Sequence, residues 1–289
     1  MKNKSLLGKL ILLLTAAIWG SGFTFTDIAL DYFTTFQVIA MRFTIAFIIV
    51  AIVYFNRLKN ITKDDFIKGF IIGSILFAAY LFQTLGLVYT TTSKNSFLTA
   101  VNVVLVPFIS WMILKNKLSK NTLLGALVTL IGIGLISFTS TGKETGFNIG
   151  DVISLIGAVF FAGHLFYADH YGDHIDSFKV MVLQMGTAAF WSWLAVLFFG
   201  ETNFVFTTAS IMPILYIGIF TTLVAYALMA IAQKMTTSTE AAIILSTEAF
   251  FGLLTAVWLL NDPVTLPMII GGVLIFCGIL VVELNPIKE

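Results

Sequence analysis

The sequence has 289 residues, of which 58% are hydrophobic and 11% are charged, and its formal net charge is +1. A soluble domain carries about 25% charged residues because its surface has to be polar, so a soluble fold is excluded and most of the surface is expected to face lipid. The chain has no basic block that would indicate nucleic-acid binding. Its single cysteine, Cys277, excludes a disulfide framework or a cysteine metal cluster.

Ten segments are apolar and long enough to cross a bilayer as helices, which takes about 20 residues. In chain order they are residues 6–26, 33–55, 67–88, 95–114, 121–139, 149–168, 178–199, 211–231, 239–260 and 267–284. The connections between them are short and leave no room for a soluble domain. The first segment is also compatible with a signal peptide, but it has a counterpart later in the chain and is predicted to be the first membrane helix.

Basic residues predict the orientation, because they are retained preferentially on the cytoplasmic side. With a cytoplasmic N-terminus, thirteen basic residues fall on that side: Lys2, Lys4, Lys9, Arg57, Lys59, Lys63, Lys68, Lys115, Lys117, Lys120, Lys179, Lys234 and Lys288. Only Lys94 and Lys143 fall on the outer side, and Arg42 lies within a helix. We therefore predict a protein of the cell membrane (inner or plasma membrane) with both termini cytoplasmic.

The two halves of the chain are related by an internal repeat. A shift of 142 positions pairs Gly8 with Gly150, Leu13 with Leu155, Ala16 with Ala158 and Asp31 with Asp173, and sets Trp19 against Phe161 and Arg42 against Gln184. A shift of 146 positions pairs Ala79 with Ala225, Tyr80 with Tyr226, Thr90 with Thr236, Gly125 with Gly271 and Gly132 with Gly278. A four-residue insertion in the second half reconciles the two shifts. We predict two five-helix repeats, residues 1–142 and 143–289.

An odd number of helices per repeat inverts the second repeat relative to the first. Inverted repeats recur in secondary transporters, which bind substrate near the membrane midplane where the halves meet. Two similar halves can exchange conformations, and this exchange converts an inward-open cavity into an outward-open one. The repeat therefore predicts transport by alternating access.

Several stretches of both halves carry a family pattern. They are residues 83–90, 96–100 and 106–107, then Tyr226 and residues 233–234, 241–248 and 271–278, together with residues 19–21, Phe23 and Arg42. They resemble EamA-type transporters of the drug/metabolite transporter superfamily over nearly the whole chain. Three sites depart from that pattern: Glu-Pro in helix 9 is Glu248-Ala249 here, and the Gly-Glu pairs after helices 4 and 9 are residues 115–116 and 261–262.

The resemblance implies ten helices with cytoplasmic termini and movement of metabolites, amino acids, nucleobases or drugs, often as export. No phosphate-binding glycine loop occurs, so the energy is expected from a proton or ion gradient, from counter-substrate exchange or from the substrate's own gradient. No cofactor is expected, and the chain is predicted to act as a monomer or homodimer. A channel or scaffold without gradient coupling and, less well supported, a membrane-embedded enzyme remain as alternatives.

Ionisable residues inside the spans are the first candidate site residues, because charge in hydrocarbon is costly. Glu248 can bind a cationic substrate group or carry a proton, or can form a structural hydrogen bond. Arg42 can receive an anionic group, or can pair with Glu248, Asp27 or Asp31. His164 can titrate near neutral pH or pack through a hydrogen bond.

The other candidates are uncharged residues that can either line a cavity or join helices: Trp19, Tyr80, Gln83, Asn95, Asn102, Gln184 and Tyr226. Tyr80 and Gln83 share a helix face, since they are three residues apart. The glycines spaced seven apart, such as Gly125 and Gly132, permit close helix packing within the chain or in a dimer.

Two further groups of polar residues have structural interpretations. Thr237 and Glu240 match a capping box at a helix start, and Thr91 and Thr92 are expected to cap the fourth helix. Five acidic and histidine residues in the turn after helix 6 resemble a metal cluster, but polar residues are usual in an exposed turn, and no metal site is predicted. They are Asp169, His170, Asp173, His174 and Asp176.

Overall fold

The computed structural model describes residues 2–115, 117–138, 146–172 and 176–283, which form helices and short connections without a strand. Ten helical segments in this part of the chain are long and apolar enough to cross a membrane, which confirms the all-α membrane fold and the predicted number of spans. The boundary predicted between residues 142 and 143 lies outside the described residues, as do Asn116, Lys143, Asp173, His174 and Lys288.

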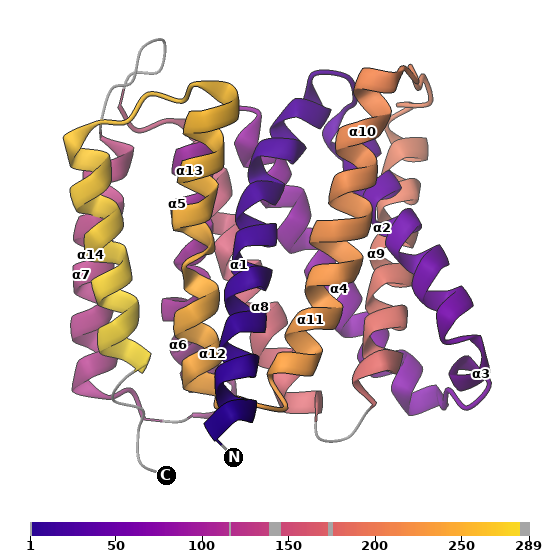
Figure 1. Cartoon of the computed structure of the whole chain (residues 1–289), viewed down its shortest axis with the longest axis horizontal. Coiled ribbons are helices and arrows are strands. Elements are labelled where there is room, and N and C mark those ends of the chain that lie inside the picture. Colours follow the sequence, from indigo (N-terminus) through magenta and orange to yellow (C-terminus); the bar gives the residue numbers. More distant parts are fainter. Residues whose placement is uncertain (1, 116, 139–145, 173–175, 284–289) are drawn as a thin grey trace.

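The first five spans lie before residue 138. They are α1 (Lys2–Leu30), α2 (Thr35–Val53), α4 (Lys63–Leu87), α5 (Thr92–Ala100) followed by α6 (Asn102–Leu114), and α7 (Lys120–Ser137), with the short α3 (Phe55–Leu58) between α2 and α4. The other five are α8 (Ile149–Gly172), α9 (Ser177–Phe198), α10 (Thr208–Tyr216) continuing through the π-helix η1 (Ile217–Val224) into α11 (Ala225–Ala232), α12 (Ser238–Ser246) followed by α13 (Glu248–Leu260), and α14 (Leu266–Glu283). Figure 1 shows α1 beginning and α14 ending at the same end of the bundle.

Threonine hydroxyls start many of these helices by accepting a hydrogen bond from a backbone N–H that has no partner within the helix. Thr91 caps α5 by accepting from the N–H of Lys94, as predicted. Thr237 and Glu240 form the predicted capping box at the start of α12. The short polar connections therefore end one span and start the next with their backbone groups satisfied.

Two spans are broken at equivalent places. Val101 separates α5 from α6, and Thr247 separates α12 from α13, which is the 146-residue spacing found in the sequence. The same spacing relates Lys115 and Asn261, which end α6 and α13 in the left-handed conformation with φ of 60° and 57°. They are the two non-glycine residues with positive φ in the described part of the chain. The breaks place the starts of α6 and α13 inside the membrane.

Helices from the two halves pack against each other throughout the bundle. α4 lies against α8, α1 lies against α11 and α13, and α2 lies against α9. α7 and α14 form a separate close pair, in which a Cβ atom added to Gly125 or Gly132 would lie 2.6 Å from the carbonyl oxygen of Gly278 or Gly271. The glycines therefore serve the helix packing that was predicted for them, and they do so within one chain.

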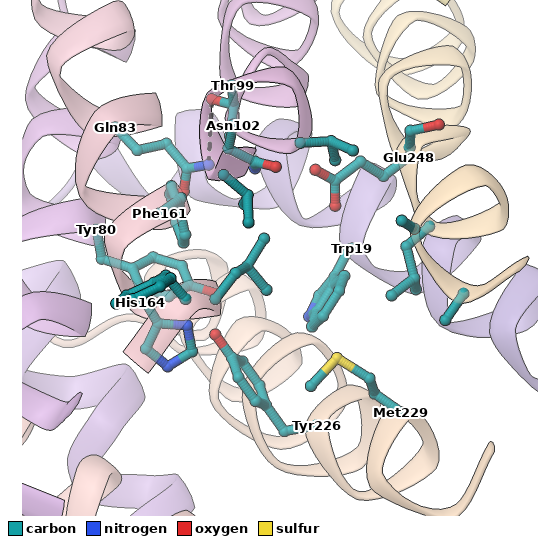
Figure 2. Close-up of a pocket in the computed structure, with 18 of the residues that line it drawn as sticks. Trp19, Tyr80, Gln83, Thr99, Asn102, Phe161, His164, Tyr226, Met229 and Glu248 are labelled. Carbon is teal, nitrogen blue, oxygen red and sulfur yellow. Dashed lines mark hydrogen bonds between the residues drawn. The ribbon is translucent and has the colours of Figure 1, made fainter. Parts of the chain in front are cut away.

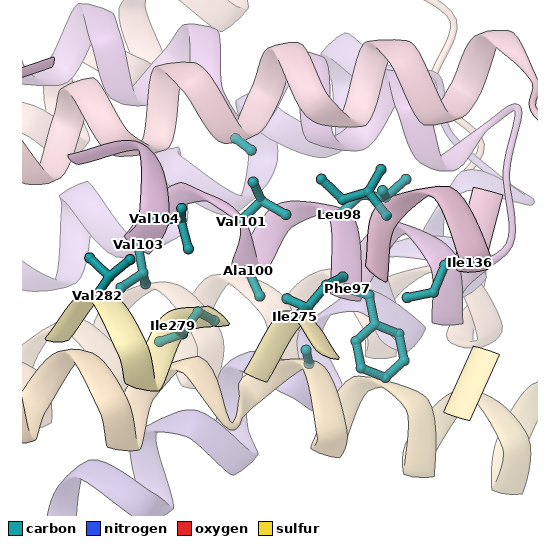
Figure 3. Packing of buried hydrophobic residues seen from close by; sticks show 13 residues of the cluster. Phe97, Leu98, Ala100, Val101, Val103, Val104, Ile136, Ile275, Ile279 and Val282 are labelled. Atoms are coloured by element: carbon teal, nitrogen blue, oxygen red, sulfur yellow. The ribbon is translucent and has the colours of Figure 1, made fainter. Parts of the chain in front are cut away.

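The α7–α14 pair is joined to the rest of the bundle by an apolar cluster (Figure 3). Phe97, Leu98 and Val101 of the broken span pack with Ile136 of α7 and Ile275 of α14. All five are at least nine-tenths buried. The cluster supports the break between α5 and α6 from behind and leaves the other side of that span free to line a cavity.

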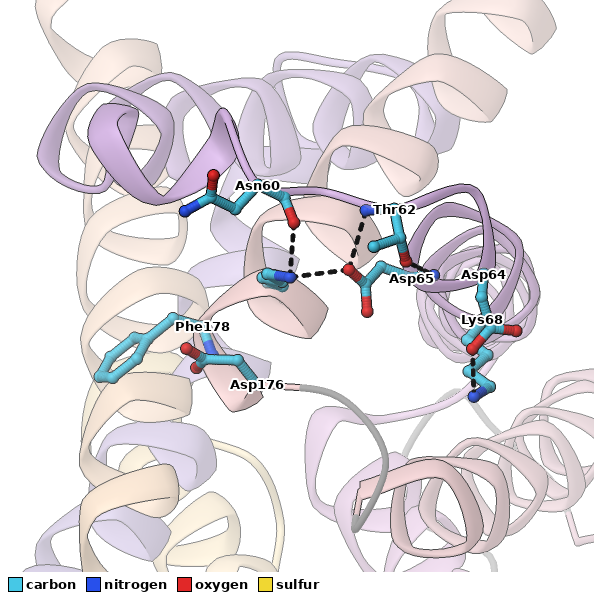
Figure 4. Close-up of polar contacts among 8 residues, drawn as sticks. Asn60, Thr62, Asp64, Asp65, Lys68, Asp176 and Phe178 are labelled. Atoms are coloured by element: carbon cyan, nitrogen blue, oxygen red, sulfur yellow. Dashed lines mark hydrogen bonds and ion pairs between the residues drawn. The ribbon is translucent and has the colours of Figure 1, made fainter.

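Polar contacts fasten the connections at the end where α1 begins (Figure 4). The ammonium group of Lys179 on α9 lies 2.7 Å from the carboxylate of Asp65 on α4 and donates to the carbonyl of Asn60 at 2.8 Å. Lys68 pairs with Asp64 one turn away at 2.5 Å. These basic residues lie at the end of the bundle that was predicted to be cytoplasmic.

Candidate functional site

A cavity of about 480 Å³ lies in the middle of the bundle. Its walls come mainly from α1, α4, the broken spans α5–α6 and α12–α13, α8 and α11, with single residues from α2, η1 and α14. Eight of the ten candidate residues line it: Trp19, Arg42, Tyr80, Gln83, Asn102, His164, Tyr226 and Glu248. Figure 2 shows Glu248 on one side of the cavity, with Tyr80 and Gln83 on the other.

The other two candidates do not line this cavity. Asn95 is fully buried and donates to the carbonyl of Gln83 at 3.1 Å and to the hydroxyl of Ser154 at 2.8 Å. Gln184 lies behind His164 and contacts its Nε2 at 2.9 Å. Both residues therefore join helices, which is the alternative that the sequence left open for them.

Glu248 is the first residue of α13, directly after the break at Thr247. A carboxylate at a helix N-terminus is stabilised by the helix dipole, which offsets part of the cost of a charge inside the membrane. Among the described residues its carboxylate has no hydrogen-bond or ion-pair partner, and it faces the cavity (Figure 2). The equivalent residue in the first half is Asn102, the first residue of α6.

Arg42 is held by hydroxyl groups of the π-helix. Its Nε donates to Thr222 at 3.1 Å and one terminal nitrogen donates to Thr221 at 3.2 Å. The guanidinium carbon lies 4.2 Å from the ring centre of Tyr80, a cation–π contact that stabilises a desolvated charge. The structure pairs Arg42 with none of the carboxylates considered from the sequence within the described residues, so the cation is buried without an anion.

Sequence reasoning missed Thr221 and Thr222 because their role depends on η1. In a regular α-helix, consecutive side chains point about 100° apart, since each turn takes 3.6 residues. The wider π-helix, a geometry frequent at functional sites, turns both hydroxyls toward Arg42. Each also donates to the carbonyl of Ile217, at 2.9 and 2.7 Å. Pro213 in α10 is the one signal in the sequence that this span is irregular.

Two aromatic pairs flank the charges. Trp19 meets Tyr226 edge to face at 5.3 Å, and Phe161 meets Tyr80 in the same way at 5.1 Å. The indole N–H of Trp19 donates to the carbonyl of Thr221 at 2.9 Å. Phe161 is a second lining residue absent from the predicted site, although its pairing with Trp19 in the repeat could have indicated it.

The cavity also offers uncharged hydrogen-bonding groups. Gln83 lies 3.4 Å from the hydroxyl of Thr99. The side-chain oxygen of Asn102 is buried without a partner, which is costly unless another group supplies a donor. The lining therefore combines the amide groups of Gln83 and Asn102 with the carboxylate of Glu248.

The cavity reaches the end of the bundle at which α1 begins. Asp169 and His170 near the end of α8, Ala242 of α12 and Leu114 at the end of α6 border it there. Asp169 and His170, which were predicted to lie in an exposed turn, are exposed residues of α8 at this mouth. Within the described residues no group of three metal-binding side chains occurs.

Two regions of the chain, residues 6–138 and 148–284, match the sequence profile of the EamA-like transporter family. An uncharacterized transporter of Archaeoglobus fulgidus is 35% identical over 98% of this chain and 87% of its own length. The uncharacterized transporter YvbV of Bacillus subtilis is 23% identical over 95% of this chain and 90% of its own length.

A solved crystal structure has a similar fold. Its TM-score is 0.69 at 17% sequence identity, and the similarity covers 95% of each chain. At this identity the likeness supports the arrangement of the helices alone.

Proposed function

Because the chain belongs to the EamA-like transporter family, we propose that it is a secondary transporter that exports a small polar metabolite, amino acid or drug across the cell membrane by alternating access. Membership of this family makes it a multi-pass membrane transporter with a small-molecule substrate. The observation that carries the rest of the proposal is a single central cavity bordered by two opposite charges, neither of which has an ionic partner among the described residues.

Equivalent structural features in the two halves support alternating access. The broken spans, the left-handed ends at Lys115 and Asn261, and the two aromatic pairs recur at the spacings of the sequence repeat. We propose that residues 1–142 and 143–289 are inverted repeats whose exchange of conformations moves the opening of the cavity from one end to the other. The basic residues at the α1 end support a cytoplasmic location for that end.

The two charges support a substrate that carries a positive and a negative or strongly polar group. An ion buried without a partner is costly, so a molecule that supplies the missing counter-charges gains binding energy from both. Glu248 would accept an ammonium group. Arg42, which donates to the neutral hydroxyls of Thr221 and Thr222, would also donate to a carboxylate or a similar group of the substrate. In the absence of substrate, a proton on Glu248 would neutralise the carboxylate, which gives a route to proton coupling.

Purified protein in proteoliposomes tests this proposal. We expect saturable uptake of a labelled zwitterionic amino acid or metabolite from a screened panel, accelerated by unlabelled substrate on the opposite side. Non-saturable flux without acceleration would indicate a channel, and chemical conversion of the solute would indicate an enzyme. The Glu248→Gln variant tests the proton route, because unchanged pH dependence of its transport would remove that role.

A further inference from the structure

The end of the cavity opposite its mouth is closed by the first turn of α5. The hydroxyl of Thr92 donates to Asp27 of α1 at 2.8 Å. The backbone N–H and hydroxyl of Ser93 donate to Asp262, after α13, at 3.0 and 2.8 Å. Two successive residues at the start of α5 therefore bind two other elements, α1 and the connection that follows α13.

The next residue, Lys94, makes a different kind of contact. The distribution of basic residues predicts that Lys94 lies on the outer side, and its side chain is fully buried there. Its ammonium group donates to the carbonyl of Gly146 at 3.2 Å and lies 3.9 Å from Asp151 of α8, which is also fully buried. This ion pair joins α5 to α8, two helices that also pack directly against each other.

An equivalent ion pair exists at the other end of the molecule. The repeat spacings of 146 and 142 residues relate Lys94 to Glu240 and Asp151 to Lys9. Lys9 of α1 and Glu240 of α12 form an ion pair at 2.6 Å. At the equivalent positions the positive and negative residues are interchanged, but the ion pair is present at both ends. Residues related by the repeat therefore occupy similar places at the two ends of the molecule.

The contact that closes the cavity differs between the ends. The residue equivalent to Asp27 is Asp169, and the residue equivalent to Thr92 is Ser238, the first residue of α12. Asp27 is engaged by the start of α5, whereas Asp169 is exposed and borders the open mouth. Asp169 is therefore the equivalent of the residue that holds the closed end, but it lies at the end that is open.

We propose that Asp27 and Asp169 are the latch residues of two alternating gates, each closing its end of the cavity by binding the first turn of the opposing broken span. This inference rests on the proposed alternating-access function. A carboxylate suits the task because it forms strong hydrogen bonds with hydroxyl and N–H donors and is attracted to a helix N-terminus. Since each latch stabilises one state only, removing it shifts the equilibrium toward the other state.

Accessibility of single cysteines from each face tests the two latches. In a Cys277→Ser background, Ala242→Cys reports on the open mouth and Ser96→Cys, at the equivalent position, reports on the closed end. Each reporter is labelled with a membrane-impermeant maleimide in vesicles of both orientations. Asp64→Asn, which removes an exposed carboxylate that pairs within its own helix, is the control and should change neither rate.

We expect Asp27→Ala to raise labelling of Cys at position 96 from its face by about ten-fold, the effect of losing one hydrogen bond to a charged group. Thr92→Val removes the donor and should act in the same direction, which guards against a folding defect in the aspartate variant. Asp169→Ala should lower labelling at position 96 and raise it at position 242. The double variant Asp27→Ala/Asp169→Ala should return both rates toward those of the parent.

Shifts in the same direction for Asp27→Ala and Asp169→Ala, or no shift in either, would overturn the latch inference even if substrate transport is found. Opposite shifts support it. If those shifts occur in a protein that shows no saturable flux for any solute, the proposed transport function fails while the two gates stand.

Discussion

Two pairs of aromatic rings border the cavity at equivalent positions, and two charges lie beside them at positions that are not matched. Trp19 with Tyr226 and Phe161 with Tyr80 have nearly the same geometry, 5.3 Å at 68° and 5.1 Å at 75°. In contrast, the repeat relates the charged Glu248 to the neutral Asn102, and the charged Arg42 to the neutral Gln184.

The difference between the two sets shows how one cavity can serve two tasks. Alternating access requires contacts that are equally good after the halves exchange their conformations, and equivalent aromatic pairs meet this need. Substrate recognition requires groups that match the two ends of one asymmetric molecule. We therefore assign conformational exchange to the equivalent residues and specificity to the unmatched charges.

The largest difference is expected when the side chains of Glu248 and of its counterpart Asn102 are altered separately. Glu248→Gln should lower transport at subsaturating substrate by at least about thirty-fold, because loss of one partner of a buried charged contact costs roughly 2–5 kcal/mol. Asn102→Ala should lower it by less than about ten-fold, as expected for a neutral hydrogen bond. Initial rates in proteoliposomes measure both effects, and equal losses would show that the two positions are functionally alike.

Substitution of glycines in α7 and α14 tests whether residues related by the repeat are also equivalent away from the cavity. Gly125→Ala and Gly271→Ala each place a Cβ 2.6–2.7 Å from a facing carbonyl oxygen, so each should cost about 1–3 kcal/mol of stability, the usual cost of overpacking. The melting temperature in detergent should fall to a similar extent in both variants.

Gly134→Ala is the matched control for this pair, because nothing lies within 4 Å of an added Cβ there. It should leave the melting temperature unchanged or raise it. A large difference between Gly125→Ala and Gly271→Ala would show that the α7–α14 contact is not equivalent on its two sides.

The smallest effect is expected when the aromatic pairs are made more alike. Trp19→Phe gives both pairs a phenylalanine and loses only the hydrogen bond from the indole to Thr221, worth about 0.5–1.5 kcal/mol. The KM for substrate should change by no more than about ten-fold, since about 1.4 kcal/mol corresponds to a factor of ten. A loss as large as that of Glu248→Gln would assign specificity to the rings and contradict the division of roles.

The sequence predicted the ten spans and eight of the residues that line the cavity, because both follow from hydrophobic length and from the rarity of polar residues in a membrane helix. The failures have local physical causes. Thr221 and Thr222 act together only because η1 is a π-helix. Lys94 lies near a span end, where a count of charges treats it as exposed, but Asp151 from a distant part of the chain pairs with it inside the protein.

Asn95 and Gln184 show a second limit of sequence reasoning. Their polarity is compatible with a cavity wall or with a helix contact, and the outcome depends on which helix packs against each residue. The hydroxyl of Ser154 on α8 accepts a hydrogen bond from the amide of Asn95, and His164 on the same helix forms a hydrogen bond with Gln184. Whether such a side chain points toward a neighbouring helix or toward the cavity is set by tertiary packing and has no signature in the local sequence.

Substrate binding to Arg42→Gln shows whether Arg42 recognises the negative end of the substrate, since this change gives position 42 the amide of its counterpart Gln184. Affinity is measured in detergent for the zwitterionic substrate and for its amine analogue, which lacks the carboxylate. We expect Arg42→Gln to weaken binding of the zwitterion by about ten-fold or more and to leave binding of the amine unchanged. Equal weakening of both ligands would mean that Arg42 supports the cavity without recognising the negative end of the substrate.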